Sequence, residues 1–413
     1  MRLRSYRPPF QFPLELIEFT IDYLHDSPST LRACARVSRA WVAPSHFHLF
    51  YCHKTTPTKI RNLLKFLRGS PHIARYIREF HLSAGYSYAP NSDWPEVDAS
   101  LPRLSGRLKQ LRKLVLTGIP FSELVPKTRA AFRALFALPR LVDVHVITLR
   151  VVKVEHFTTL LCSPLKRLTL TDSFLEGRPH SENIRAIDKE IKAMELQQRS
   201  PCRLEYLSSN SSVFIRWLLG TQTMFDISTI RTLDVMVKSK HREELMARLI
   251  RRLGPSLEDL TIQLPKIEDW GAPFLIYLAL GLTDEYLNDH PDGSPTKDSI
   301  DVECNSNIQR LAVRAEFNHP LAPYLKYLLS RLSATNLQQI TIFIAVPWSH
   351  DAMNWHGWNE VDQVLDGVKF RGLKEVAIVV NADQDTDNIR QHLTDQFPSM
   401  YGKGTLDIRS LIV

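Results

Sequence analysis

The sequence predicts an α/β protein in which a small N-terminal helical module precedes an irregular solenoid, with parallel strands on one side and helices on the other. Three observations predict this fold. A compact apolar segment occupies residues 12–50, a six-residue apolar motif recurs within residues 77–413, and stretches of helical length separate its copies. Residues 51–76 are expected to be a linker or the helix of a first repeat.

Residues 1–50 are expected to form the helical module. Pro13 suits the first turn of a helix, because its missing N–H would have no partner there. The first helix is apolar on two sides. One side carries Leu14, Ile17, Ile21 and Leu24, and the other carries Leu16, Phe19 and Tyr23. A helix with two apolar sides needs two covers, and about forty residues cannot build a self-sufficient core. We therefore expect a partner to cover the second side.

A second helix is expected to begin at Ser27 and Pro28, which read as its cap and its first helical position. Apolar and small side chains then recur every three or four residues, at Leu31, Cys34, Val37, Ser38 and Trp41. Pro44 is expected to end this helix. The module thus reads as two helices.

The recurring motif has the order apolar-x-x-apolar-x-apolar. Its copies start at residues 77, 111, 141, 165, 204, 230, 257, 308, 337 and 373, at a mean interval of about 33 residues. Each copy alternates with a period of two, which predicts a strand. Amphipathic stretches between copies predict helices at Lys127–Leu138, Asn183–Gln198, Arg242–Leu253 and Pro323–Leu332. One strand and one helix per repeat is typical of a leucine-rich solenoid.

The array is expected to be irregular, because its intervals range from 24 to 51 residues. Polar, turn-rich segments predict surface loops at 83–100 and 284–307. The tail, residues 405–413, is expected to add a last strand that caps the array. The tryptophan-rich segment 347–360 either contacts a partner or folds over the edge of the array.

Composition excludes several classes of protein. The net charge of +8 is spread along the chain without a basic block, so no nucleic-acid partner is expected. The most apolar stretch, residues 274–282, is too short to cross a bilayer, so no membrane partner is expected. Five scattered cysteines without a C-x-x-C pair favour a reducing compartment, the cytoplasm or the nucleus.

Neither a catalytic residue nor a cofactor is predicted. The sequence contains no nucleophile elbow, phosphate-binding loop, dinucleotide fingerprint or H-E-x-x-H motif, so an enzyme is not expected. His46, His48, Cys52 and His53 lie close together, but nothing downstream completes a metal-ligand spacing, so no metal is predicted. This segment is interpreted as the link into the array, with Phe47, Leu49 and Phe50 packing inward.

Residues 12–41 resemble the F-box. The stretches FPLELIEFTIDYL and LRACARVSRAW match the family pattern, and the second is similar to the large fungal F-box families. Two positions depart from it, since Phe12 replaces the leading Leu and Thr20 stands where Ile is usual. The Thr20 side chain is expected to weaken docking by about 1 kcal/mol. The matching positions are Pro13, Glu15, Leu16, Ile17, Ile21, Leu24, Leu31, Val37 and Trp41.

The resemblance implies a function. An F-box docks on a Skp-type adaptor of a cullin–RING ubiquitin ligase, and the repeats of such a protein hold a protein substrate. The nine matching residues are then expected to bind the adaptor. The substrate is not identified by the outward positions of the strands, such as Lys113, His145, Arg167, Asp234 and Arg310. The alternative is a leucine-rich scaffold that binds proteins without a role in ubiquitin ligation.

Overall fold

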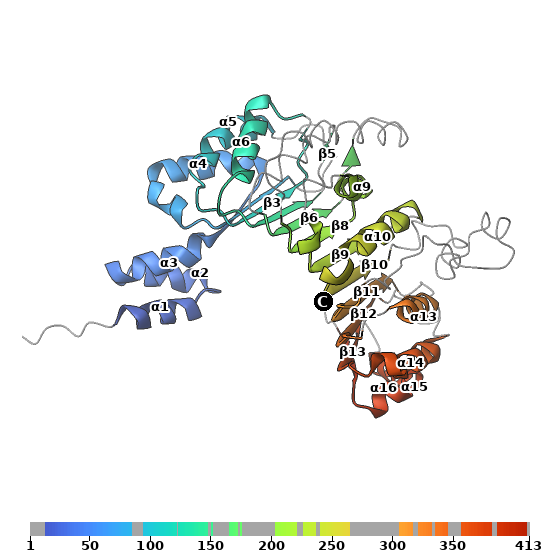
Figure 1. Ribbon diagram of the computed structural model, residues 1–413. Helices are drawn as coiled ribbons and strands as arrows, with labels where there is room; N and C mark the ends of the chain where they lie inside the picture. The colour runs from blue at the N-terminus through green and yellow to red at the C-terminus, as the bar shows by residue number, and fades with distance from the viewer. Residues whose placement is uncertain are drawn as a thin grey trace, which may run out of the picture. The chain divides into compact units, whose positions relative to one another are not determined.

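The computed structural model describes most of the chain. The described residues are 13–84, 94–121, 123–147, 150–151, 165–171, 174–175, 203–220, 226–236, 240–264, 305–316, 321–332, 335–345, 357–381 and 386–410. They belong to two compact units, of which unit 1 comprises residues 1–152 with 158–164, and unit 2 comprises 153–157 with 165–413. Each unit is an α/β structure with parallel strands and helices (Figure 1).

Unit 1 begins with three helices and continues with strands that alternate with helices. Its helices are α1 (Leu14–Tyr23), α2 (Pro28–Cys34), α3 (Arg39–Tyr51), α4 (Ile60–Gly69), α5 (Trp94–Ser105) and α6 (Pro126–Phe136), with 3₁₀ turns at Pro57–Lys59 and Pro71–Arg75. Its strands are β1 (Cys52–Thr55), β2 (Glu79–Ser83), β3 (Lys113–Thr117), β4 (Asp143–Ile147) and the short β5 (Arg150–Val151). Strands β1 to β4 pair in chain order, and all pairs are parallel.

Unit 2 repeats the same arrangement. Its strands are β6 (Arg167–Thr171), β7 (Phe174–Leu175), β8 (Tyr206–Ser209), β9 (Thr232–Met236), β10 (Asp259–Gln263), β11 (Arg310–Glu316), β12 (Gln339–Ala345), β13 (Glu375–Asn381) and β14 (Leu406–Ser410). Its helices are α9 (Ser212–Gly220), α10 (Lys240–Leu253), α13 (Leu321–Arg331), α14 (Trp358–Asp366), α15 (Thr386–Gln396) and α16 (Pro398–Gly402), with 3₁₀ turns at Ile227–Thr229, Gly254–Ser256 and Val368–Phe370. The parallel order is β6-β8-β9-β10-β11-β12-β13-β14.

The predicted strands are confirmed. All ten copies of the apolar motif lead into a strand, from β2 to β13, and the tail forms β14. In most strands buried and half-exposed residues alternate, as in β2, where Phe80 and Leu82 are fully buried and Glu79 and His81 are not. The predicted helices at 127–138, 242–253 and 323–332 correspond to α6, α10 and α13, whereas 183–198 lies outside the described residues.

Three expectations from the sequence are corrected. The module has three helices rather than two, because the chain breaks helical conformation at 35–38 and restarts with α3, inside which Pro44 lies. Pro44 therefore does not end the helix; it deprives only the carbonyl of Ala40 of its partner. The helix expected within 51–76 is α4, Ile60–Gly69, but residues 52–55 before it form strand β1, which pairs with β2.

The third correction concerns the loop expected at residues 83–100. Residues 94–100 begin helix α5, whose Trp94, Val97 and Leu101 are buried. The spacing of these three side chains is helical, but the neighbouring turn residues obscured it in the sequence. The loop expected at 284–307 lies almost wholly outside the described residues.

Two buried polar side chains hold the ends of helices in unit 2. Helix α10 is followed by Gly254, whose φ of 53° suits a residue without a side chain. The buried Asn305 amide donates hydrogen bonds to the carbonyls of Ile250 and Gly254, at 3.1 and 2.7 Å. Asp362 of α14, also buried, accepts from the backbone N–H groups of Ser399 and Met400, both at 3.0 Å, where α16 begins.

Replacing Asp362 with alanine is expected to lower the free energy of unfolding by about 2–3 kcal/mol, because one buried and one part-buried N–H group lose their acceptor. Asp366→Ala is the matched control on the same helix. Asp366 is half exposed and pairs with the exposed Lys403, so its loss is expected to cost under about 0.5 kcal/mol. Calorimetric melting of both variants checks this; equal losses would contradict the capping role of Asp362.

Candidate functional site

Helix α1 has one covered side and one exposed apolar side. Ile17 and Ile21 are buried with Leu31 of α2, and Leu24, Trp41 and Leu49 pack against this small core. The opposite side of α1 carries Leu16, Phe19 and Tyr23, which are 49%, 64% and 81% exposed. We call these three residues the α1 apolar face. Their spacing of three and four residues places them on one side of the helix.

The α1 apolar face is continuous across the polar residue at its centre. Thr20 lies on the same side of the helix, and its hydroxyl donates a hydrogen bond to the carbonyl of Leu16, at 2.7 Å. The hydroxyl already has a hydrogen-bond acceptor within the helix. An apolar surface that covers Thr20 therefore leaves no donor without a hydrogen bond. The rings of Phe19 and Tyr23 lie 5.9 Å apart in a tilted arrangement. Three large exposed side chains on one helix side form a surface suited to docking.

The structure divides the nine predicted adaptor-binding residues between core and surface. Pro13, Glu15, Leu16 and Val37 are exposed. The other five, Ile17, Ile21, Leu24, Leu31 and Trp41, lie together in or against the core of the module. Phe19 and Tyr23 belong to the exposed surface although the family pattern did not select them. The signal for them was the second apolar side of the helix.

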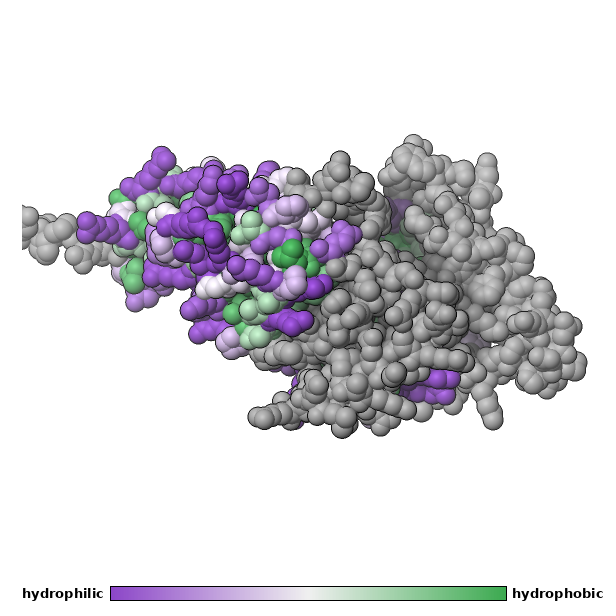
Figure 2. Space-filling view, turned by 90° about the horizontal axis from the view of Figure 1, so that it is seen from above, coloured by the Kyte–Doolittle hydropathy of each residue, from purple (hydrophilic) through white to green (hydrophobic). Residues whose placement is uncertain are grey.

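Seen from above, the described surface of the molecule is mainly hydrophilic, and its hydrophobic residues lie in small groups (Figure 2). The α1 apolar face is defined by its residues and their exposure rather than by this view. Val37, in the turn between α2 and α3, adds a further exposed apolar side chain at 65%.

The strands of unit 1 carry a second surface, made of side chains that alternate with the buried ones. We call it the open face of unit 1. One row of residues in register contains Cys52, Glu79, Lys113 and Asp143. The next row contains Lys54, His81, Val115 and His145. The predicted outward positions of Lys113 and His145 are therefore confirmed.

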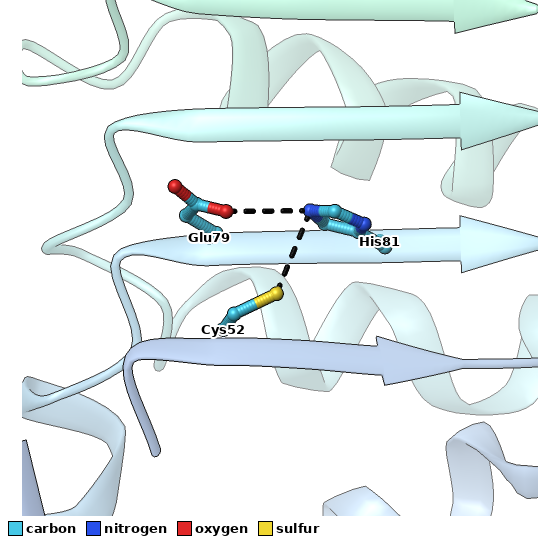
Figure 3. A group of neighbouring side chains, drawn as sticks. All are labelled: Cys52, Glu79 and His81. Atoms are coloured by element: carbon cyan, nitrogen blue, oxygen red, sulfur yellow. Dashed lines mark hydrogen bonds and ion pairs between the residues drawn. The ribbon is translucent and has the colours of Figure 1, made fainter. Parts of the chain in front are cut away.

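Three side chains of this open face converge on one point (Figure 3). The Nε2 atom of His81 lies 3.6 Å from the Sγ atom of Cys52 and 3.5 Å from a carboxylate oxygen of Glu79. Burial lowers the pKa of His81, and the Glu79 carboxylate partly opposes this shift. Burial also raises the pKa of the Cys52 thiol, with the Glu79 carboxylate adding to the shift. Sequence reasoning missed this group, because Cys52 lies 27 and 29 positions before its two partners.

Two of the three histidines that lie near Cys52 in the sequence, His46 and His48, have other partners. The His48 ring lies 2.7 Å from the Asp22 carboxylate of α1. The His46 ring packs edge-on against Phe50 and lies over His72. Phe50 in turn contacts Phe66 of α4. Helix α3 ends at Tyr51 and β1 begins at Cys52, so this segment links the helical module to the strands, as the sequence suggested. Among these histidines, none is recorded in contact with Cys52.

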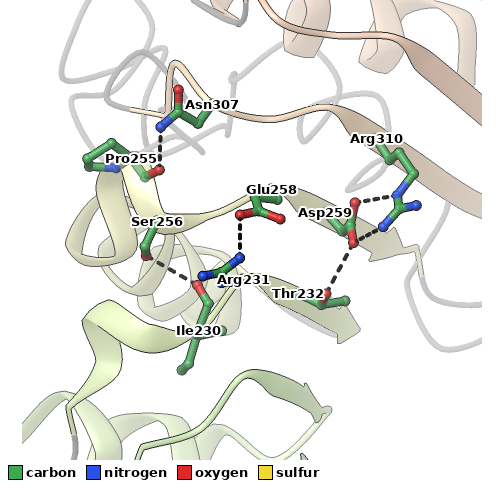
Figure 4. A network of polar contacts seen from close by, with 9 residues as sticks. All are labelled: Ile230, Arg231, Thr232, Pro255, Ser256, Glu258, Asp259, Asn307 and Arg310. Carbon is green, nitrogen blue, oxygen red and sulfur yellow. Dashed lines mark hydrogen bonds and ion pairs between the residues drawn. The ribbon is translucent and has the colours of Figure 1, made fainter.

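In unit 2 too, side chains alternate with the buried ones along the strands, and we call the surface that they form the open face of unit 2. It holds paired charges. Arg310 of β11 forms two hydrogen bonds with the carboxylate of Asp259 on β10, which also accepts from Thr232 of β9 (Figure 4). Arg231 pairs with Glu258 at the same ends of the strands. Such exposed pairs contribute little to stability but shape the charge pattern of the surface. Arg167, Asp234 and Arg310 lie on this face, as predicted.

Asp234 on β9 predicts a pH dependence of stability. Burial raises its pKa above the ordinary 3.8, and Arg314 and a hydrogen bond with Ser208 only partly offset this. The folded state then binds more protons than the unfolded state as pH rises through the window above 3.8. The free energy of unfolding therefore falls as the pH rises across that window. The destabilisation by the charged Asp234 carboxylate remains at neutral pH.

Asp234→Asn is accordingly expected to raise the melting temperature at pH 7 and to lose this advantage when the pH falls to about 3.5, near the reference pKa of aspartate. Melting curves of both proteins across this range provide the measurement. Asp259→Asn on the neighbouring strand serves as the control and is expected to give no gain at any pH, because Asp259 is paired with Arg310. A gain of equal size at all pH values would contradict the titration of Asp234.

The tryptophan-rich segment is described only from residue 357 on. Trp358 begins α14, is 2% exposed, and its ring lies 5.7 Å from that of Phe397. This tryptophan is therefore part of the core of unit 2. The other two tryptophans of the segment lie outside the described residues.

No protein-family model matches the chain, and no curated protein matches its sequence significantly. Within the described ranges, each helix is too short or too polar to traverse a lipid bilayer. The fold and surfaces define an α/β repeat protein whose first helix has one exposed apolar side.

Proposed function

We propose that the chain is a non-enzymatic, substrate-recruiting adaptor of an SCF-type cullin–RING ubiquitin ligase. In this proposal the N-terminal helical module is an F-box that docks on a Skp-type adaptor, and the strands belong to a leucine-rich solenoid that holds a protein substrate. The cytoplasm or the nucleus is the proposed location. The observation that carries the proposal is the α1 apolar face, Leu16, Phe19 and Tyr23.

The energetics of the module support docking. Its core is small, with three buried side chains of α1 and α2 and three partly buried ones around them. Covering the α1 apolar face would remove large aliphatic and aromatic side chains from water, each worth about 1.5–3 kcal/mol when fully buried. Such side chains, packed in a partner's pocket, provide most of the energy of protein interfaces. The resemblance of residues 12–41 to the F-box names the partner.

The open faces support the second half of the proposal. Side chains on parallel strands form rows of outward positions in each unit, with charged, aromatic and small polar residues interspersed. In unit 2, for example, Arg167 lies over the ring of Tyr206 and Arg314 over that of Phe343, at 4.5 and 5.0 Å. Arginine and aromatic residues are enriched at protein interfaces. A protein substrate is therefore the ligand proposed for these faces.

Co-purification of the full chain with a Skp-type adaptor tests the proposal. The two proteins are expected to elute as a stoichiometric complex in size-exclusion chromatography after co-expression. Failure of the wild-type chain to form this complex would overturn the ligase role. The alternative, a leucine-rich scaffold without a ligase, predicts that outcome together with retention of other protein partners.

A further inference from the structure

The three side chains that converge on the open face of unit 1 have the chemistry of a metal site. Cys52 comes from β1, and Glu79 and His81 come from β2, where alternate residues point to the same face. One ligand atom from each lies within 4.8 Å of the other two. Thiolate sulfur, imidazole nitrogen and carboxylate oxygen are the ligands that Zn²⁺ takes in proteins.

The two separations from His81 fit a tetrahedral ion, and the third, between Cys52 and Glu79, is at most 4.8 Å. With metal–ligand bonds of about 2.0–2.3 Å, two ligands of a tetrahedral zinc ion lie about 3.3–3.6 Å apart. The observed separations from His81 Nε2 are 3.6 Å to Cys52 Sγ and 3.5 Å to the Glu79 oxygen. The separation from the Glu79 oxygen is longer than an ordinary hydrogen bond between nitrogen and oxygen, which is about 2.9 Å, whereas the separation from Cys52 Sγ is that of a hydrogen bond to sulfur.

Hydrogen bonds already link the three side chains. Both contacts of His81 end on the same atom, Nε2, as Figure 3 shows. In the neutral ring this nitrogen either donates one proton or accepts one. The Glu79 carboxylate also interacts with the Cys52 thiol through a hydrogen bond. Hydrogen bonds and a bound cation are therefore alternative ways to hold these three side chains together, and metal titration distinguishes them.

We propose that Cys52, Glu79 and His81 bind one Zn²⁺ ion, with a water molecule in the fourth position. The thiolate and the carboxylate together neutralise the charge of the ion. Lys54 and Lys113 lie near enough to influence the group, and Lys113 is itself paired with Asp143 at 3.6 Å. The fourth position faces solvent, since the side chains of His81 and Glu79 are 22% and 27% exposed.

Binding releases the thiol proton of Cys52 to solvent, and the sulfur lone pair then forms the bond to the ion. No electron is transferred. Affinity is therefore expected to rise with pH, since the thiolate is the ligand. This site does not depend on the proposed role in ubiquitin ligation.

Titration of the full chain, purified under reducing conditions, tests the site. Co²⁺ reports on tetrahedral zinc sites through its visible absorption and through a sulfur-to-metal charge-transfer band in the near ultraviolet. One equivalent of Co²⁺ is expected to produce both signals, and one equivalent of Zn²⁺ is expected to abolish them. Zn²⁺ is also expected to raise the melting temperature of the wild-type chain.

Three substitutions identify the ligands, namely Cys52→Ser, Glu79→Gln and His81→Gln. Each is expected to weaken Zn²⁺ binding by about a hundredfold or more, because loss of a mere supporting residue already costs 10–100-fold. Cys52→Ser is also expected to remove the charge-transfer band. His145→Ala is the matched control, since His145 lies in the same row as His81, on β4, with Asp143 as its partner.

Melting curves without metal show whether each variant folds, and only folded variants are compared. Absence of the charge-transfer band in the wild-type chain would overturn the proposal. So would a band that survives Cys52→Ser, or an equal loss of affinity in His145→Ala. A Zn²⁺ affinity that is the same in all four variants and the wild type would identify adventitious surface binding and overturn it as well.

Discussion

The double substitution Leu16→Ala with Phe19→Ala is expected to weaken the proposed binding to a Skp-type adaptor at least about a hundredfold. Both side chains belong to the α1 apolar face and are about half or more exposed, at 49% and 64%. Residues that anchor an interface cost about 2 kcal/mol or more each when truncated, and every 1.4 kcal/mol is tenfold in affinity. Isothermal titration of the purified chain with the adaptor measures the change.

The same substitutions are expected to leave the fold intact, because exposed side chains contribute little to folding. Leu14→Ala is the matched control. Leu14 lies on the same helix and is equally exposed, at 51%, but on another side of it. Its truncation is expected to change the affinity by less than about threefold, because Leu14 lies outside the α1 apolar face. Equal weakening by Leu14→Ala would place the docking surface elsewhere on the module.

Phe80→Ala is expected to destabilise unit 1 by about 3–5 kcal/mol, which corresponds to a melting temperature lower by about 10 °C. Phe80 is fully buried on β2, in register with His53 of β1 and Leu114 of β3. Truncation removes the transfer energy of the ring and leaves a cavity that the paired strands cannot close. Differential scanning calorimetry measures the loss.

Phe19→Ala removes the same side chain at an exposed position. Comparing the two variants separates the effect of losing a buried ring from the effect of the Phe→Ala change itself. It is expected to shift the melting temperature by no more than about 2 °C, in line with exposed substitutions elsewhere. A loss similar to that of Phe80→Ala would mean that Phe19 is part of a core. Conversely, a small loss for Phe80→Ala would contradict its place between the strands.

The repeat strands were predictable because burial on one side leaves a period of two in the sequence. Ten motif copies and the tail each lead to a strand, including the degraded copy before β8. Helices α6, α10 and α13 were predictable for the same reason at helical spacing. Strand β1 was not, since Cys-His-Lys-Thr has little apolar alternation and depends on pairing with β2.

The sequence predicted that the N-terminal module is helical, but not where one helix ends and the next begins. Local propensity favoured a continuous second helix up to Pro44, whereas the structure interrupts it before Ser38 and carries it through Pro44 to Tyr51. Packing of α3 on both α1 and α2 brings Trp41 and Leu49 against the core and outweighs the lost hydrogen bond at Pro44. Tertiary contacts routinely override local preference in this way.

The sequence by itself determined the α/β class, the positions of the repeat strands, the two apolar sides of the first helix and the resemblance on which the proposed function relies. Only the tertiary structure decided which apolar side is covered, with Ile17 and Ile21 inside and Leu16, Phe19 and Tyr23 outside. It alone also placed Cys52 beside Glu79 and His81. The physical reason is the same in both cases. Periodicity along one element records that a side is buried, whereas the partner that buries it, and the residues that neighbouring strands bring into register, depend on how distant segments pair.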